Sequence, residues 1–125
     1  MSAVGTPGAP FDDLAFDYAA GQALEALSIL ESRGDLPSWA GPQLDVLAGI
    51  LEAPGAVPAY MSEAADKVCR SHGYQLSAII AAMRNLAAQG PTPGAGLRTL
   101  LGFIGEWRKE VRAVRPPPKF TARGG

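Results

Sequence analysis

The chain has little of what chemistry in proteins usually requires. Of its 125 residues, one is cysteine (Cys69) and one is histidine (His72). A lone cysteine cannot form a disulfide within the chain, and these two side chains supply fewer ligands than the three or four that a zinc site takes. There is also no serine-nucleophile motif and no glycine-rich phosphate loop. We therefore predict a non-enzymatic protein with no catalytic residues, no metal and no cofactor.

Long apolar runs and targeting segments are missing as well. No uninterrupted apolar stretch approaches the roughly 18 residues of a membrane-spanning helix. The first residues lack the basic and apolar regions of a secretory signal. These absences predict a cytoplasmic protein that does not enter membranes.

What the chain does have is globular and helical in composition. Hydrophobic residues make up 47% and charged residues 18%, and alanine and leucine far outnumber β-branched residues. The 15 glycines and 11 prolines gather at the two ends and between segments of regular apolar spacing. We predict an all-α, compact bundle of about five helices in a single domain (residues 12–115). A flexible, extended Pro/Gly-rich N-terminal arm (residues 1–11) precedes it, and an extended basic C-terminal tail (residues 116–125) follows.

Apolar residues recur at steps of three and four in five segments, which is the spacing of one helix face. Glycine and proline separate these segments, as expected at helix ends. The expected helices run from Asp12 or Asp13 to Arg33, from near Pro42 to Pro54, from Pro58 to about His72, from about Tyr74 to Gln89, and from Leu97 to Arg115.

Charge is sorted between the two halves of the chain, although the formal net charge is only −1. Residues 1–66 contain ten acidic side chains and one basic side chain, Arg33, whereas residues 67–125 contain ten basic and two acidic side chains. Such sorting indicates an internal acid–base contact, head-to-tail association of copies, or a basic end that meets a polyanion. The sequence leaves these three interpretations open.

The basic residues are densest at the end of the fifth expected helix and in the tail. Residues at steps of three and four form a basic stripe beside the apolar one, and an aromatic side chain in the tail is suited to stacking or to insertion into a pocket. The simpler alternative is that these bases complement the helix dipole and are otherwise solvated. The candidate partner-binding residues are Arg108, Lys109, Arg112, Arg115, Lys119, Phe120 and Arg123.

Three further residues are candidates for an interface. Gly102 and Gly105 interrupt the fifth expected helix, where glycine costs about 1 kcal/mol relative to alanine. Such glycines suggest close packing of another helix from this chain or from a second copy. Trp39 lies in a linker, where an aromatic side chain either fastens the loop to the core or forms an interaction hot spot.

One pattern favours nucleic-acid binding. The order of apolar residues from Leu44 onward, closing with Leu86 and Gly90, is similar to the tri-helical core of winged helix-turn-helix proteins. That resemblance implies a helix-turn-helix-like unit at about residues 57–90, with a reading helix from Tyr74 to Gln89. No β-wing is expected to follow it, because the next segment is again helical.

The interpretation that the sequence favours most is a helical assembly or interaction protein. Its basic C-terminal helix and tail would dock onto an acidic surface, supplied by residues 12–52 of a second copy or by another partner. A nucleic-acid-binding regulator is the main alternative, and a small inhibitor or accessory subunit of a larger enzyme is the second. The abundance of alanine, glycine, proline and arginine indicates a bacterial or phage accessory protein.

Overall fold

A computed structural model of the chain describes residues 13–90 and 96–114. The expected arm (residues 1–11) and tail (residues 116–125) lie outside the described residues. For the described residues, the prediction of an all-helical bundle of about five helices is confirmed, and these residues form no strand. The elements are α1 (Asp13–Arg33), α2 (Ala40–Glu52), the short 3-10 helix η1 (Pro54–Ala56), α3 (Ala59–His72), α4 (Leu76–Gln89) and α5 (Leu97–Val114).

Glycines end α1 and α3, as their positions in the sequence predict. The backbone of Gly34 has φ +83° and that of Gly73 has φ +74°, a left-handed conformation that other residues rarely adopt. The N–H of Gly34 donates to the carbonyl of Leu30 at 2.8 Å, which satisfies one of the last carbonyls of α1. These two residues therefore fix where the chain leaves each helix.

The start of α2 differs from the expectation by two residues. The helix begins at Ala40, whose N–H donates to the carbonyl of Pro37 at 3.0 Å, and not at Pro42. Pro42 is tolerated because the N–H groups of the first helical turn have no partner within the helix. The proline therefore lies inside the first turn and does not define the helix start.

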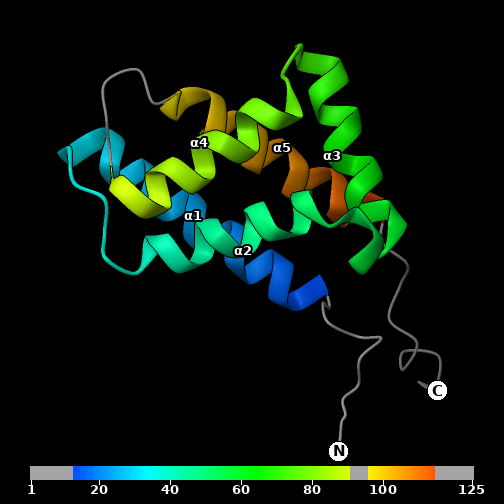
Figure 1. The fold of residues 1–125 in the computed structure, drawn as a ribbon, viewed down its shortest axis with the longest axis horizontal. Helices are drawn as coiled ribbons and strands as arrows, with labels where there is room; N and C mark the ends of the chain where they lie inside the picture. Colours follow the sequence, from blue (N-terminus) through cyan, green and yellow to red (C-terminus); the bar gives the residue numbers. More distant parts are fainter. Residues whose placement is uncertain (1–12, 91–95, 115–125) are drawn as a thin grey trace, which may run out of the picture.

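The helices form two layers with a fifth helix at one end (Figure 1). Helices α2 and α4 lie in front and pack along each other, α1 and α5 lie behind them, and α3 covers α5 at the right-hand end. Ion pairs show that α1 and α5 are antiparallel: Asp17 near the start of α1 meets Arg112 near the end of α5, and Glu31 near the end of α1 meets Arg98 near the start of α5. The start of α1 and the end of α5 are consequently neighbours.

The core is apolar throughout, and no polar or charged residue is fully buried among the described residues. Trp107 of α5 lies at its centre with no exposed surface, in edge contact with Phe16 of α1 at a ring-centroid distance of 4.7 Å. Its indole Nε1 donates to the carbonyl of Met61 in α3 at 2.9 Å. Trp107 thus joins α1, α3 and α5.

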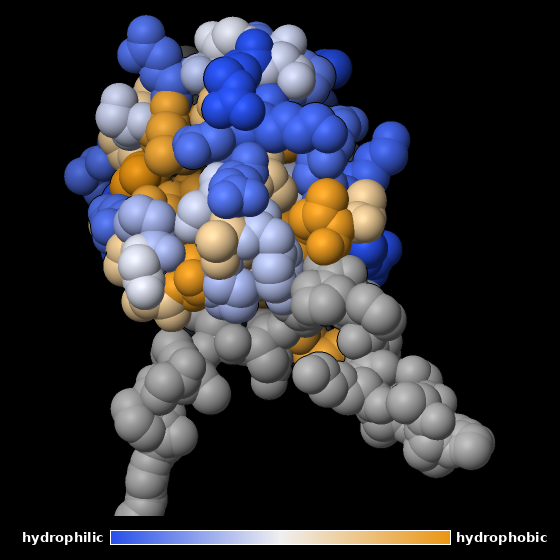
Figure 2. Space-filling model, turned by 90° about the vertical axis from the view of Figure 1, so that its right-hand side faces the viewer, coloured by the Kyte–Doolittle hydropathy of each residue, from blue (hydrophilic) through white to orange (hydrophobic). Residues whose placement is uncertain are grey.

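The face of the bundle at the end where α3 lies carries both hydrophilic and apolar side chains (Figure 2). Figure 2, which views the end of the bundle where α3 lies, shows a continuous hydrophilic upper part and apolar surface on either side of it. In the described part of the chain, no helix combines the length and the apolar character that crossing a membrane requires.

Candidate functional site

The basic stripe predicted on α5 does not point uniformly into solvent. Arg108 and Arg112 both reach Asp17 of α1, each with two hydrogen bonds to its two carboxylate oxygens. The Arg112 Nε–Asp17 Oδ1 distance is 2.7 Å, and the Arg108 Nη2–Asp17 Oδ2 distance is 3.0 Å. We call Asp17, Arg108 and Arg112 the Asp17 clamp. It fastens the start of α1 to the end of α5.

Gly21 provides the space that the clamp requires. A Cβ atom at this position would lie 2.9 Å from Nη2 of Arg108, closer than side-chain atoms approach one another. The Arg108 guanidinium therefore lies over the backbone of α1, one helical turn beyond Asp17. The sequence patterns considered above did not predict the pairing of Asp17 with these two arginines. The signal was the matched spacing of Asp17 and Gly21 with Arg108 and Arg112, four residues apart in each helix.

The clamp is electrostatically strong for a group at the surface. The Asp17 side chain is only 20% exposed and the Arg108 side chain 27%, whereas that of Arg112 is 51% exposed. The hydrogen bonds from Arg112, and then those from Arg108, hold the pKa of Asp17 well below its ordinary value, against an opposing effect of burial. The same contact raises the pKa of Arg112. Asp17 therefore stays ionised at every physiological pH.

Other ion pairs also join the acidic half of the sequence to the basic half. Arg98 of α5 pairs with Glu31 of α1 at 3.2 Å. Arg84 of α4 pairs with Asp45 and Glu52 of α2, which lowers the pKa of Glu52. An internal acid–base contact, one of the three interpretations of the charge sorting, therefore accounts for part of the asymmetry.

The remaining predicted partner-binding residues fall into two groups. Lys109 is exposed on α5 and makes no ion pair with any described residue. Arg115, Lys119, Phe120 and Arg123 lie outside the described residues. Within the described chain, Lys109 is thus the member of the predicted set that remains unengaged.

The three candidate interface residues have different surroundings. A Cβ at Gly102 would lie 3.0 Å from the hydroxyl of Tyr74, and one at Gly105 would lie 4.0 Å from Leu24 of α1. Both glycines therefore face side chains of their own chain. Trp39 precedes α2 and is 40% exposed, so it is neither a core residue nor fully solvated.

The helix-turn-helix-like unit expected at residues 57–90 corresponds to α3 and α4. These helices pack against different neighbours, α3 along α5 and α4 along α2. In α4, the only basic side chain is Arg84, and two carboxylates of α2 hold it. The exposed polar residues of the expected reading helix are Gln75, Ser77, Asn85 and Gln89.

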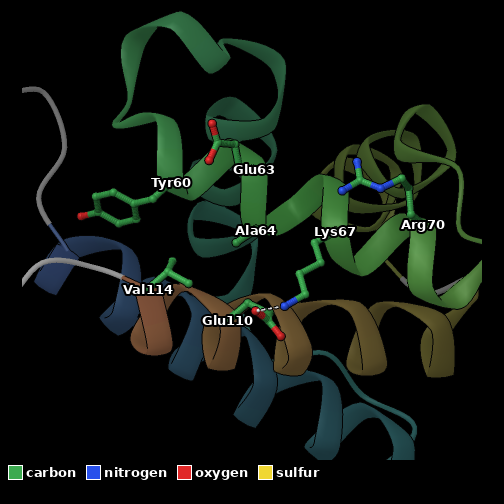
Figure 3. A pocket seen from close by; sticks show the side chains of 7 residues that line it. All are labelled: Tyr60, Glu63, Ala64, Lys67, Arg70, Glu110 and Val114. Atoms are coloured by element: carbon green, nitrogen blue, oxygen red, sulfur yellow. Dashed lines mark hydrogen bonds and ion pairs between the residues drawn. The ribbon is translucent and has the colours of Figure 1, made fainter.

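Hollows open on the described surface, and two of them lie beside α5. The first, of about 260 Å³, lies between α3 and the end of α5; in Figure 3 Tyr60 and Val114 lie at one end and Arg70 at the other. Lys67 crosses it to Glu110 at 3.1 Å. The second, of about 280 Å³, is mainly apolar and is lined by residues of α4 and α5 that include Ile79 and Leu100. No group of three potential metal ligands occurs among residues 13–90 and 96–114.

Apolar side chains are exposed around the Asp17 clamp. Leu14 and Tyr18 of α1 are 75% and 62% exposed, and Val114, the last residue of α5, is 51% exposed. All three lie at the end of the bundle where α1 begins and α5 ends.

Comparisons with protein-family models, with curated proteins and with solved structures find no match to this chain.

Proposed function

We propose that this protein is a non-enzymatic interaction protein that docks onto an acidic surface of another copy or of a partner protein. It docks through the basic end of α5 and the residues that follow it. The observation that carries the proposal is the composition of this end of the bundle. Exposed apolar side chains, Leu14, Tyr18 and Val114, lie there, and Lys109 is an exposed base of α5 that makes no ion pair with a described residue.

Apolar side chains in the middle and charges around them are the composition of a protein–protein interface. Burial of exposed apolar area releases about 25 cal/mol per Å², so Leu14 and Tyr18 together can contribute a substantial part of a binding free energy. Lys109 and the bases that follow Val114 (Arg115, Lys119 and Arg123) supply the charge that selects an acidic partner.

The Asp17 clamp gives this surface a fixed shape. It holds α1 against α5, so the apolar residues of α1 and the base on α5 keep a constant relation to each other. A surface that is rigid before binding loses less entropy when it binds. In this proposal, Arg108 and Arg112 support the docking surface and Lys109 contacts the partner.

A photo-crosslinking amino acid tests the proposal in cells. Ala113 is exposed near the end of α5 and Ala81 is exposed on α4, so the same replacement at the two sites forms a matched pair. We expect a specific crosslinked protein from position 113 and none from position 81. Changing Arg115, Lys119 and Arg123 to glutamate should abolish that product.

Two results would contradict the proposal. One is equal crosslinking from positions 113 and 81, which would mean that this end of the bundle contacts nothing specific. The other is crosslinking of position 113 to nucleic acid, which would instead support the helix-turn-helix-like alternative. A crosslinked enzyme would instead support the second alternative, a small inhibitor or accessory subunit of that enzyme.

A further inference from the structure

The neighbouring outer sides of α1 and α5 form one surface, which we call the α1–α5 face. On α1 it carries Leu14, Tyr18 and Glu25, which follow one another at steps that keep them on one side of the helix. On α5 it carries Gly105 and Lys109, four residues apart. Glu25 and Lys109 are both exposed, and neither makes an ion pair with a described residue. Glu25 and Lys109 are therefore an unpaired acid and an unpaired base on the same face.

The contacts between the two helices fix the register of this face. Four contacts define it: Asp17 with Arg112, Gly21 with Arg108, Leu24 with Gly105, and Glu31 with Arg98. In this antiparallel register Glu25 lies level with Ile104, and Lys109 lies level with Ala20. At a rise of 1.5 Å per residue, Glu25 and Lys109 are offset by about 7 Å along the bundle. They are also on different helices, so they do not meet within one chain.

We propose that the α1–α5 face binds a second copy of this chain through a two-fold axis, a proposal that rests on the proposed function and names its partner. The axis lies in the plane of the face, crosses the line from Glu25 to Lys109 at its midpoint and is perpendicular to that line. Rotation about this axis brings each Glu25 onto Lys109 of the other copy. Two equivalent ion pairs then form across the interface, because a two-fold axis repeats every contact.

The same axis also places apolar surface in the interface. With α1 and α5 about 9 Å apart, the axis passes close to Tyr18, so this residue meets Tyr18 of the second copy. Tyrosine in this position combines apolar contact area with a hydroxyl that can still reach water. The exposed aromatic ring at the centre and the two ion pairs beside it together account for the unpaired groups of the face.

Self-complementarity is the reason to choose a second copy over another protein. A different acidic partner would pair with Lys109 and would leave Glu25 next to its own negative charge. A second copy satisfies both charges at once, with the arrangement that the face already has.

Charge exchange between two variants tests this inference. In Glu25→Lys both interfacial pairs become Lys–Lys, and in Lys109→Glu both become Glu–Glu. Each variant alone should dimerise on the order of thirtyfold more weakly than the wild-type chain. In an equimolar mixture, however, a dimer of one copy of each variant has two pairs of opposite charge. One is the original Glu25–Lys109 pair, and in the other the lysine is at position 25 and the glutamate at position 109. We expect the mixture to dimerise with nearly wild-type affinity, as 1:1 heterodimers.

Matched controls separate this effect from general changes of charge. Glu63→Lys and Arg70→Glu make the same kinds of change at exposed positions of α3, away from the face, and should dimerise like the wild-type chain. Circular dichroism checks that every variant remains folded. Dimerisation is measured by sedimentation velocity across protein concentration.

A wild-type chain that stays monomeric, single variants that dimerise normally, or a mixture that fails to recover would each overturn the inference. The crosslinking experiment separates a failure of self-association from a failure of the proposed function. If the crosslink from position 113 survives in Glu25→Lys and joins a different protein, docking stands and self-association through the α1–α5 face fails. If that crosslink is absent in the wild-type chain, docking itself fails.

Discussion

Replacing Asp17 with alanine removes the shared acceptor of Arg108 and Arg112, and we expect it to lower the free energy of unfolding by about 2 kcal/mol. A hydrogen bond to a charged group contributes about 1.5 to 3 kcal/mol when its partners are shielded from water. Arg112 is half-exposed and is therefore screened, whereas Arg108 and Asp17 are mostly covered. The contribution should thus come mainly from Arg108, which would lose its partner while remaining largely buried.

Acid provides a second measure of the same contact. The ordinary pKa of this carboxyl group is 3.8, and that of Asp17 in the folded chain is lower. The stabilisation is therefore fully present above about pH 5 and is lost as the pH falls below 3.8 towards the folded-state pKa. The difference in stability between wild type and Asp17→Ala should accordingly shrink in acid.

Thermal and urea denaturation, followed by circular dichroism, measure both effects. For a chain of this length, 2 kcal/mol corresponds to a fall in Tm of about 8 °C. The control is Glu31→Ala, which breaks an ion pair whose arginine, Arg98, is 89% exposed, and which should cost about 0.5 kcal/mol or less. Equal losses in the two variants, or a difference between wild type and Asp17→Ala that persists unchanged in acid, would refute the reasoning about the Asp17 clamp.

Three further predictions test the packing. Gly49→Ala should raise the free energy of unfolding by about 1 kcal/mol, and Gly73→Ala should lower it by about 1 kcal/mol. Neither added Cβ meets an atom within 4 Å, but only Gly73 has a positive φ. Changes of the same sign in denaturation would contradict this. Trp107→Phe should cost about 2 kcal/mol by urea denaturation, since the smaller ring leaves a cavity in the core and the Met61 carbonyl loses the hydrogen bond from the indole. A loss below about 0.5 kcal/mol would contradict this prediction. Burial, and then the charge of Asp66, raises the pKa of the Cys69 thiol, so alkylation at pH 8 should be at least about tenfold slower in the native chain than in denaturant; comparable rates would show that the thiol is accessible.

Much of the fold was predictable because local signals agreed with the tertiary structure. Glycines at the ends of α1 and α3 define the boundaries through backbone conformation, which neighbouring helices do not alter. The regular apolar spacing of α5 coincides with its buried face, which includes Trp107. The start of α2 was less certain because a proline is compatible with several positions in a first turn.

The surface was less predictable, because pairing between distant residues decides which charges remain available. The basic stripe on α5 was visible in the sequence, but its pairing with Asp17 depends on the antiparallel register of α1 and α5. Gly21 illustrates the difficulty, since a glycine within a helix acquires its meaning only when the Arg108 side chain lies across it. The exposure of Leu14 and Tyr18 likewise depends on which side of α1 the neighbouring helices cover.

Association through the α1–α5 face is the claim that connects the fold, the charge distribution and the proposed function. Sedimentation equilibrium of the wild-type chain, over a wide range of concentration and at about 0.05 M and about 0.5 M salt, tests it most directly. We expect the average mass to rise with concentration from that of one chain to that of two, with weaker association at high salt. The mass of a single chain at every concentration and at both salt levels would contradict it.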